Sequence, residues 1–321
     1  MRTPDRPVGR GCAALVALAT AALLGGCAPA ENADALFAAL GSEDVEARQE
    51  AADKIESIVE SGGYAVFVRG LDSKVPLNRA TSIIQLARMP QPGAREALRA
   101  QLAVGRRVML PYNPIRVRPA RELSDSRILV ANLIHRGGGD PAALGVLLAG
   151  VEENRPADLL EGTCFAVGAL GDPAGIPFLE KAARHRELAV PRAAVQALGQ
   201  FQEPEAVTAL GRLVQHPAME VRSDVITSLA GRDDEATRAL LRSMGESDPA
   251  PELRASAYSA LSRLNDPALV PYLIDRLKDA QGPARDSAAE TLARITGQSL
   301  GTKPEPWQRW WARNHAATPP R

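Results

Sequence analysis

A helix-loop-helix unit recurs eight times along this chain, and its regular spacing constrains the fold more than any other feature. The copies are marked by a column of apolar residues, the core column: Ile55, Leu86, Ile134, Val167, Leu198, Leu229, Leu261 and Leu292. Successive members lie 31, 48, 33, 31, 31, 32 and 31 residues apart. A period near 31 residues is typical of a solenoid, in which each unit buries its apolar face against its neighbours.

Each copy is predicted to hold two antiparallel helices. Four residues before every core-column residue stands a small or β-branched residue, so the two columns share one face of a helix. Six or seven residues after the core column, five copies carry a proline: Pro92, Pro141, Pro173, Pro204 and Pro267. Four of these prolines follow an acidic residue. An acidic residue followed by Pro favours a helix start, because the carboxylate stabilises the positive end of the helix and Pro fits its first turn.

A second column lies seven residues before the core column and holds arginine in six copies: Arg48, Arg79, Arg127, Arg222, Arg254 and Arg285. A ladder of arginines could bind an anionic ligand along the array. The two copies with Leu160 and Pro191 in this column interrupt such a ladder. The favoured interpretation is structural, in which each arginine bonds loop carbonyls or the acidic cap of a neighbouring repeat.

Three stretches carry a resemblance to a known family: GALGDPAGIPFL at 168–179, ALGQFQEPEAVTALGRLV at 197–214 and ALSRLNDPALVPYLIDRL at 260–277. They resemble the short bacterial HEAT repeats of the phycocyanobilin-lyase type. The resemblance covers residues 35–300 and implies an all-α fold, a right-handed α-solenoid of about eight HEAT-like helix pairs. The signatures of tetratricopeptide and ankyrin repeats do not recur. Since such repeats serve many roles, the resemblance implies a fold and leaves the function open.

The first 26 residues are predicted to be a signal peptide that is removed. Three arginines within the first ten residues form a basic head, and the apolar stretch 13–24 is too short to span a bilayer. The segment ends in Leu-Gly-Gly-Cys at 24–27, which resembles the bacterial lipobox. By that resemblance Cys27 becomes the acylated first residue, and 27–34 is a lipidated tether. The alternative is an ordinary cleaved signal with an incidental cysteine.

The predicted location is the cell envelope, with the protein attached to the membrane through the lipid on Cys27. Three acyl chains exceed the two signals that stable attachment needs. Residue 28 is Ala, where Asp is the inner-membrane retention signal in enterobacterial-type sorting. That resemblance implies the periplasmic face of the outer membrane.

Charge and residue types exclude several functions. Without residues 1–26 the chain holds 35 basic and 37 acidic side chains, a net charge of about −2, which argues against nucleic-acid binding. Cys164 is then the remaining free thiol, so an internal disulfide is excluded. It lies on the buried face of its helix and is predicted to be a core residue rather than a nucleophile.

The histidines offer no catalytic or metal centre. His185 and His216 lie one period apart, and packed helices about 10 Å apart separate them too far for one zinc ion. His135 precedes three glycines that resemble an oxyanion loop, but no Gly-x-Ser-x-Gly motif follows. We therefore expect no enzyme activity, no cofactor and no metal.

The long gap in the core column contains an insertion, residues 104–121, which is a candidate partner-binding element. It has five arginines, no acidic residue, three prolines and one tyrosine. The prolines exclude a continuous helix, so a loop leaving the solenoid is predicted. The candidate binding residues are Arg106, Arg107, Tyr112, Arg116, Arg118 and Arg121. The alternative is a solvated excursion without function.

The segment 301–321 is predicted to be a C-terminal cap with a frayed end. It holds all three tryptophans of the chain, Trp307, Trp310 and Trp311, which share one face of a helix. A terminal repeat must cover its exposed face, so capping is favoured over a partner or membrane site.

Together these features predict a membrane-anchored, non-enzymatic scaffold or adaptor that binds an unknown protein partner. One alternative is a lipid or small-ligand carrier that uses the concave face of the solenoid. The other is a chaperone or lyase for a bilin-like chromophore, which only the resemblance to the repeat family suggests. The sequence does not distinguish between the insertion and the concave face as the binding surface.

Overall fold

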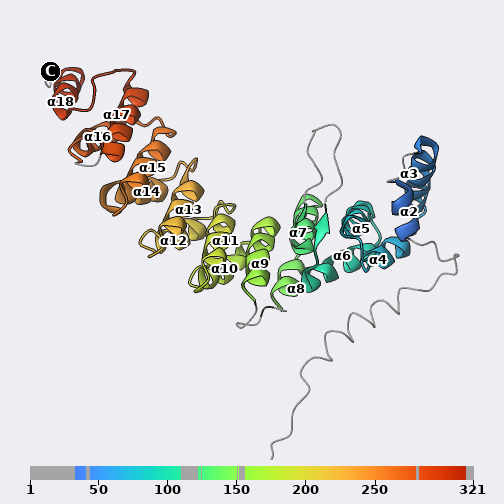
Figure 1. Cartoon of the computed structure of the whole chain (residues 1–321). Coiled ribbons are helices and arrows are strands. Elements are labelled where there is room, and N and C mark those ends of the chain that lie inside the picture. Colours follow the sequence, from blue (N-terminus) through green and yellow to red (C-terminus); the bar gives the residue numbers. More distant parts are fainter. Residues whose placement is uncertain are drawn as a thin grey trace, which may run out of the picture. The chain divides into compact units, whose positions relative to one another are not determined.

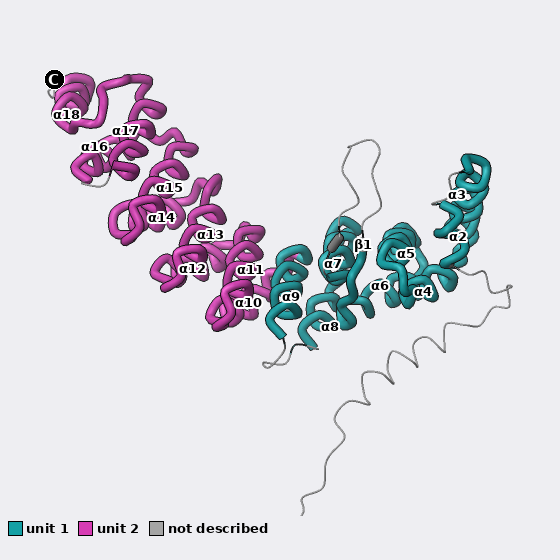
Figure 2. Tube along the Cα trace, viewed as in Figure 1, with its two compact units in different colours: residues 1–170 teal, residues 171–321 magenta. Residues whose placement is uncertain are grey.

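A computed structural model describes residues 33–40, 44–109, 122–123, 125–149, 151, 156–279 and 282–315 of the chain. Within this part the protein is an all-α solenoid, built from short helices that follow one another in pairs (Figure 1). The chain divides into two compact units, residues 1–170 and 171–321, which Figure 2 colours separately. The predicted signal peptide and Cys27 lie outside the described residues.

The first unit contains eight described helices and one short ladder of two strands. Its helices are α2 (Ala33–Leu40), α3 (Val45–Glu60), α4 (Ala65–Gly70), α5 (Pro76–Arg88), α6 (Pro92–Val104), α7 (Ser126–Arg136), α8 (Ala143–Ala149) and α9 (Ala157–Leu170). The strands β1 (Val108–Met109) and β2 (Glu122–Leu123) pair antiparallel. The rings of Phe37 in α2 and Phe67 in α4 stack with centroids 6.3 Å apart, which joins the first helix to the next repeat.

The second unit continues the same pattern. Its helices are η1 (Pro173–Gly175), α10 (Ile176–Ala182), α11 (Ala189–Leu198), α12 (Pro204–Gly211), α13 (Met219–Leu229), α14 (Glu235–Ser247), α15 (Pro251–Ser262), η2 (Pro267–Leu269), α16 (Val270–Arg276), α17 (Gly282–Thr296) and α18 (Pro304–Asn314). Successive second helices pack directly on one another, as α11, α13, α15 and α17 do. This stacking of like helices is how each repeat covers its neighbour's apolar face.

The core follows the columns read from the sequence. All eight members of the core column are buried, and the most exposed, Ile134, keeps 8% of its surface. The small residues four positions earlier are buried in every copy. The column three positions before the core column is buried in the six middle copies, whereas Ala52 and Ala289 are half-buried. The first and last copies have fewer neighbours to cover them.

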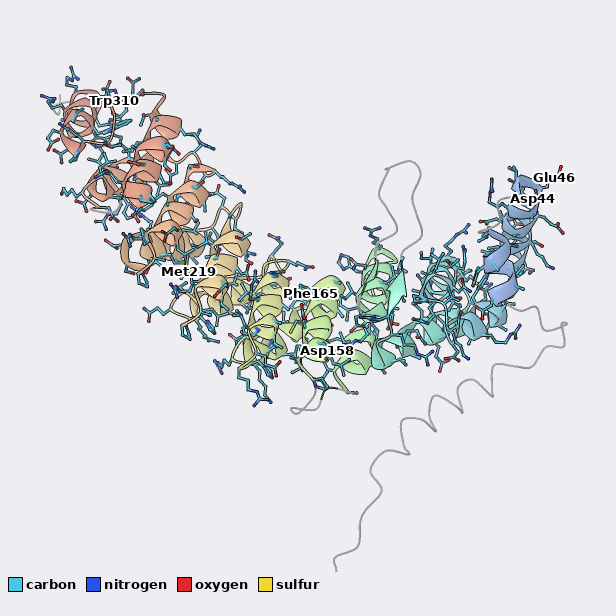
Figure 3. The ribbon with its side chains drawn as sticks, viewed as in Figure 1. Asp44, Glu46, Asp158, Phe165, Met219 and Trp310 are labelled. Carbon is cyan, nitrogen blue, oxygen red and sulfur yellow. The ribbon has the colours of Figure 1, made fainter. Side chains whose placement is uncertain are left out.

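Three of the four acidic residues before the prolines cap the following helices as predicted, whereas the Glu203 side chain makes no capping hydrogen bond at the start of α12. Asp140, Asp172 and Asp266 each accept a hydrogen bond from the backbone N–H two residues later, at 2.9–3.0 Å. Two of the predicted starts are single 3₁₀ turns, η1 and η2, before the α-helix begins. A second set of caps lies at the other edge of the repeats, where Asp44 accepts from the N–H of Glu46 at the start of α3 (Figure 3).

Candidate functional site

The recurrent arginines fasten consecutive repeats together in the second unit. Arg222 in α13 donates through Nε to Asp248 Oδ2 at 2.8 Å and through Nη1 to the His216 carbonyl at 2.8 Å. Arg254, one repeat later, makes the same pair of bonds to Asp279 and to the Asp248 carbonyl, at 2.7 and 2.8 Å. The hydrogen bond to Asp248 raises the pKa of the Arg222 guanidinium. Loop carbonyls and neighbouring acidic groups are therefore the partners of Arg222 and Arg254, which confirms the structural interpretation for these two residues.

Arg127 links two consecutive repeats in the first unit, and its side chain is fully buried. It is 2% exposed, and it donates through Nε to Asp125 Oδ2 at 2.8 Å. Across the repeat boundary it reaches Thr163 Oγ1 and the Leu159 carbonyl in α9, both at 2.9 Å. Gly162 makes room for this cluster, since a Cβ at that position would lie 3.0 Å from Asp125 Cγ. The cluster couples α7 to α9.

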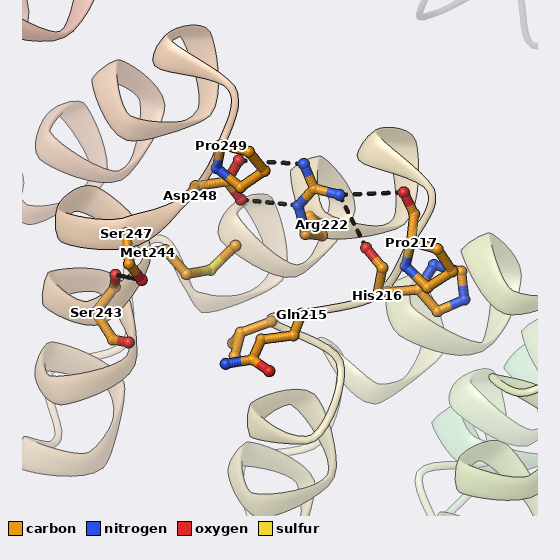
Figure 4. A pocket seen from close by; sticks show the side chains of 10 residues that line it. Gln215, His216, Pro217, Arg222, Ser243, Met244, Ser247, Asp248 and Pro249 are labelled. Carbon is orange, nitrogen blue, oxygen red and sulfur yellow. Dashed lines mark hydrogen bonds and ion pairs between the residues drawn. The ribbon is translucent and has the colours of Figure 1, made fainter.

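A hollow of about 430 Å³ lies next to Arg222, where the loop after α12 faces α14 (Figure 4). Several of its polar groups are engaged in the fold: Arg222 holds Asp248, and Ser247 Oγ donates to the Ser243 carbonyl at 2.9 Å. His216 Nδ1 accepts from the N–H of Ala218 at 3.1 Å, which shapes the loop before α13. The functional groups here therefore serve packing and loop structure.

The other reactive side chains identified in the sequence are also part of the fold, since each is buried in the core or contacts the backbone. Cys164 is completely buried, and burial raises the pKa of its thiol to about 12. His185 Nδ1 accepts from the N–H of Glu187 at 3.1 Å, which repeats the loop geometry of His216 one period earlier. His135 Nδ1 lies 3.1 Å from the Leu170 carbonyl. In the described part of the chain, no group of histidine, cysteine and acidic residues could hold a metal ion.

The insertion leaves the array through a stem, residues 106–109 with 122–123 and 125–126. Val108 pairs with Leu123 and Met109 with Glu122, and Val108 is completely buried. Ser126 closes the stem, because its Oγ accepts from the Arg106 N–H at 2.9 Å and its own N–H donates to the Arg106 carbonyl at 2.6 Å. The prediction of a loop over the whole of 104–121 is wrong at its start. Val104 ends α6, and β-branched Val108 pairs and packs against α5.

Two of the predicted partner-binding residues belong to this stem. Arg106 Nη1 donates to Asp72 Oδ1 at 2.7 Å and to the Leu71 carbonyl at 3.1 Å, so its side chain, 40% exposed, is partly engaged. The Arg107 side chain is exposed, and its carbonyl accepts from Arg79 Nε at 2.9 Å. The other four, Tyr112, Arg116, Arg118 and Arg121, lie outside the described residues.

The three tryptophans take different positions in the C-terminal helix. Trp307 is completely buried, and its Nε1 donates to the Gly301 carbonyl at 2.7 Å. Trp310 and Trp311 are half-buried, and the ring of Trp311 stacks on His315 with centroids 3.5 Å apart. The helix α18 contacts α16, the first long helix of the last repeat, rather than continuing the stack of second helices.

The family model for HEAT repeats matches residues 144–230 and 212–293. Residues 144–293 of the chain therefore match HEAT repeats. The matched residues run from α8 through α17, the part of the array with the most regular spacing. Further helices, α2 to α7, precede residue 144, with the insertion between α6 and α7. No curated protein matches the sequence.

Several solved structures are similar to this chain at low identity. Human deoxyhypusine hydroxylase in complex with glycerol is 20% identical, with 83% of this chain and 96% of that chain covered and a TM-score of 0.35. Escherichia coli YibA is 15% identical over 96% and 97%, with a TM-score of 0.34. The CpcE–CpcF complex of phycocyanin lyase from Nostoc is 16% identical over 92% and 99%, with a TM-score of 0.32. These values assign no activity to the present chain.

Two features of the site had no signal strong enough to be found in the sequence. The β1–β2 ladder is only two residues long on each side, and Glu122–Leu123 is not distinguished from its surroundings by residue type. The contact of Asp34 with Asn78, at 2.7 Å between Asp34 Oδ1 and Asn78 Nδ2, joins residues 44 positions apart that belong to no recurring column.

No helix among the described residues has the length and apolar character needed to cross a membrane.

Proposed function

We propose that this HEAT-repeat protein is a non-enzymatic scaffold, tethered to the membrane of a bacterial cell envelope through a lipid on Cys27, that binds a protein partner through its arginine-rich insertion. The observation that carries the proposal is the fixed stem. The strand pair, Ser126 and Arg79 together hold both ends of the insertion on the array. A pre-positioned loop loses less conformational freedom on binding than a free one, which favours its use as a recognition element.

The positions of the reactive side chains support a role without catalysis. The Cys164 thiol is buried with a raised pKa, so the thiolate needed for nucleophilic attack is disfavoured. His185 and His216 use Nδ1 to shape loops, and the arginines of the repeat column bond neighbouring repeats. These groups stabilise the array on which the insertion is carried.

The lipid tether is tested by the substitution Cys27→Ala. We expect the variant to incorporate no labelled palmitate and to keep its signal peptide uncleaved, because the thiol that would receive the diacylglycerol is absent. Metabolic labelling and the electrophoretic mobility of wild type and variant measure both effects. Cys164→Ala is the matched control and should label as the wild type does, since Cys164 is buried in the core. Label retained on the Cys27 variant would refute the tether.

Partner binding through the insertion is tested by replacing Arg116, Arg118 and Arg121 with Gln. We expect partner capture to fall at least about tenfold, because paired or forked arginine contacts to carboxylates carry much of such an interface. Chemical cross-linking in cells, followed by affinity purification and quantitative mass spectrometry, measures the captured partners. Arg106 and Arg107 are left unchanged because they belong to the stem.

The control removes the same charge elsewhere. Arg136, Arg263 and Arg294 are exposed residues outside the insertion, and their replacement by Gln should leave capture within about twofold of the wild type. Wild-type capture should also weaken above physiological salt, since exposed charges are screened within about 10 Å. Capture of the same partners by the insertion variant would place the binding surface on the repeats themselves.

A further inference from the structure

Large apolar side chains are exposed at or next to the start of the second helix in a repeat. In the described part of the chain they are Val45, Val75, Leu77, Leu188 and Met219, of which Figure 3 labels Met219. Val75 and Leu77 form a pair, 47% and 36% exposed, on either side of the first residue of α5. Two apolar side chains this close together on the surface of a charged protein need an explanation.

Cationic side chains surround this pair. Lys74 is exposed and directly precedes Val75. Arg79 donates to the Ser73 carbonyl at 2.6 Å and to the Arg107 carbonyl at 2.9 Å, which places the insertion stem beside the start of α5. Arg106 lies close enough to lower the pKa of Arg79 by repulsion, in addition to the effect of burial. We call residues 72–79 with Arg106 and Arg107 the α5 edge.

The acidic groups at the α5 edge are held by neighbours. Asp72 pairs with Arg106 at 2.7 Å. Asp34, in the first turn of α2, accepts from Asn78, and hydrogen bonds from Ser73 and Asn78 lower the pKa of its carboxyl. With Lys74, Arg79, Arg106 and Arg107 against these two carboxylates, the edge carries a net positive charge. An anionic surface therefore complements it.

The contact of Asp34 also shows where the tether enters. Because Asp34 bonds both Ser73 and Asn78, the first turn of α2 lies directly against the residues that flank Val75 and Leu77. Only five residues separate Cys27 from Ala33, where α2 begins. Six Cα–Cα steps span at most about 22 Å, so a lipid on Cys27 would hold the start of α2 within that distance of the membrane, with the α5 edge directly beside it.

We propose that the α5 edge docks on the anionic surface of the membrane that holds the tether, with Val75 and Leu77 in the headgroup boundary and Lys74 facing lipid phosphates. This inference rests on the proposed lipidation of Cys27. Apolar side chains ringed by cations bind such an interface through both burial and charge, and each cation near an anionic leaflet contributes to the attraction. A lipid surface is favoured over an acidic protein, because the short tether keeps this edge beside the bilayer.

The test uses the chain from residue 27 onward with Cys27→Ser, so that binding does not depend on acylation. Flotation with vesicles containing about one-third phosphatidylglycerol in phosphatidylcholine measures the partition coefficient. We expect binding to these vesicles and much weaker binding to pure phosphatidylcholine. The double variant Val75→Ser/Leu77→Gln should reduce the partition coefficient about tenfold, and Lys74→Gln about fivefold. Ser is a favoured residue at the N-cap position of α5, so the helix start is preserved.

The matched control is Leu188→Gln/Met219→Gln, which removes two apolar side chains of similar exposure, 40% and 42%, from the same register in the second unit. It should leave the partition coefficient unchanged within about twofold. Equal losses in the two double variants, or no preference for phosphatidylglycerol, would overturn the proposal. Palmitate labelling of the Cys27 wild type is a separate readout. Labelling without vesicle binding would refute the docking edge alone, whereas binding without labelling would refute the tether alone.

Discussion

Replacing Arg127 with Met is expected to lower the free energy of unfolding of the first unit by about 3–5 kcal/mol. The guanidinium is 2% exposed and satisfies Asp125, Thr163 and the Leu159 carbonyl. Met fills a similar volume without donors, so the Asp125 carboxylate stays buried beside Gly162 with one N–H bond, from the backbone of residue 127. Hydrogen exchange of α7 and α9 measures the loss, since stability in a repeat array is coupled mainly between neighbours.

A control variant on the same helix distinguishes the loss of an exposed charge from the disruption of a buried ion pair. Arg136 is exposed in the last turn of α7, and Arg136→Met should change the stability by less than about 0.5 kcal/mol. The double variant Asp125→Asn/Arg127→Met should recover part of the loss, because Asn is neutral and still caps α7. If Arg127→Met and Arg136→Met were equally mild, the buried pair would not stabilise the α7–α9 contact.

Replacing Trp307 with Ala should destabilise the last repeat by about 3–5 kcal/mol, the range for removing a buried aromatic side chain. The indole is completely buried and donates to the Gly301 carbonyl, which fixes the approach of the chain to α18. The helix α18 covers α16, so protection against hydrogen exchange should fall first in α16 and α17. Helices α10 and α11, several repeats away, should keep theirs.

The variant Trp311→Ala is the control for Trp307→Ala. It is half-buried and stacks on His315, so Trp311→Ala should cost no more than about 1.5 kcal/mol. Unchanged exchange in α16 and α17 after Trp307→Ala would mean that α18 is held elsewhere and that its tryptophans serve a partner. A loss for Trp311→Ala as large as that for Trp307→Ala would contradict the different burial of the two residues.

The fold could be predicted because the buried positions recur in each copy of the repeat. Each column of buried residues has eight members, one in each repeat. The burial of an unusual member such as Cys164 or Tyr258 is therefore predicted correctly from the other residues of its column. The acidic caps before Pro141, Pro173 and Pro267 are local, so their hydrogen bonds follow from residue spacing alone. The same holds for Arg222 and Arg254, whose partners are set by the repeat.

The candidate sites could be predicted only in part, since each lies where the repetition fails. The insertion was recognisable from its length and charge, but its stem depends on Ser126 and Arg79, which bond its backbone from other segments of the chain. Arg106 was predicted to bind a partner, and its pairing with Asp72 requires the fold of α4 and α5. Buried Trp307 and half-buried Trp311 share one sequence pattern, and only the path of the chain at Gly301 separates them.

The contact of Asp34 with Ser73 and Asn78 has a mechanical consequence for a protein held by its N-terminal end. A pulling force on residue 27 would reach the array at the first turn of α2 and pass through these hydrogen bonds to the start of α5. The stacked rings of Phe37 and Phe67 offer a second, parallel route into α4. The force would therefore pass from α2 into the next helix pair, α4 and α5, by two routes at once.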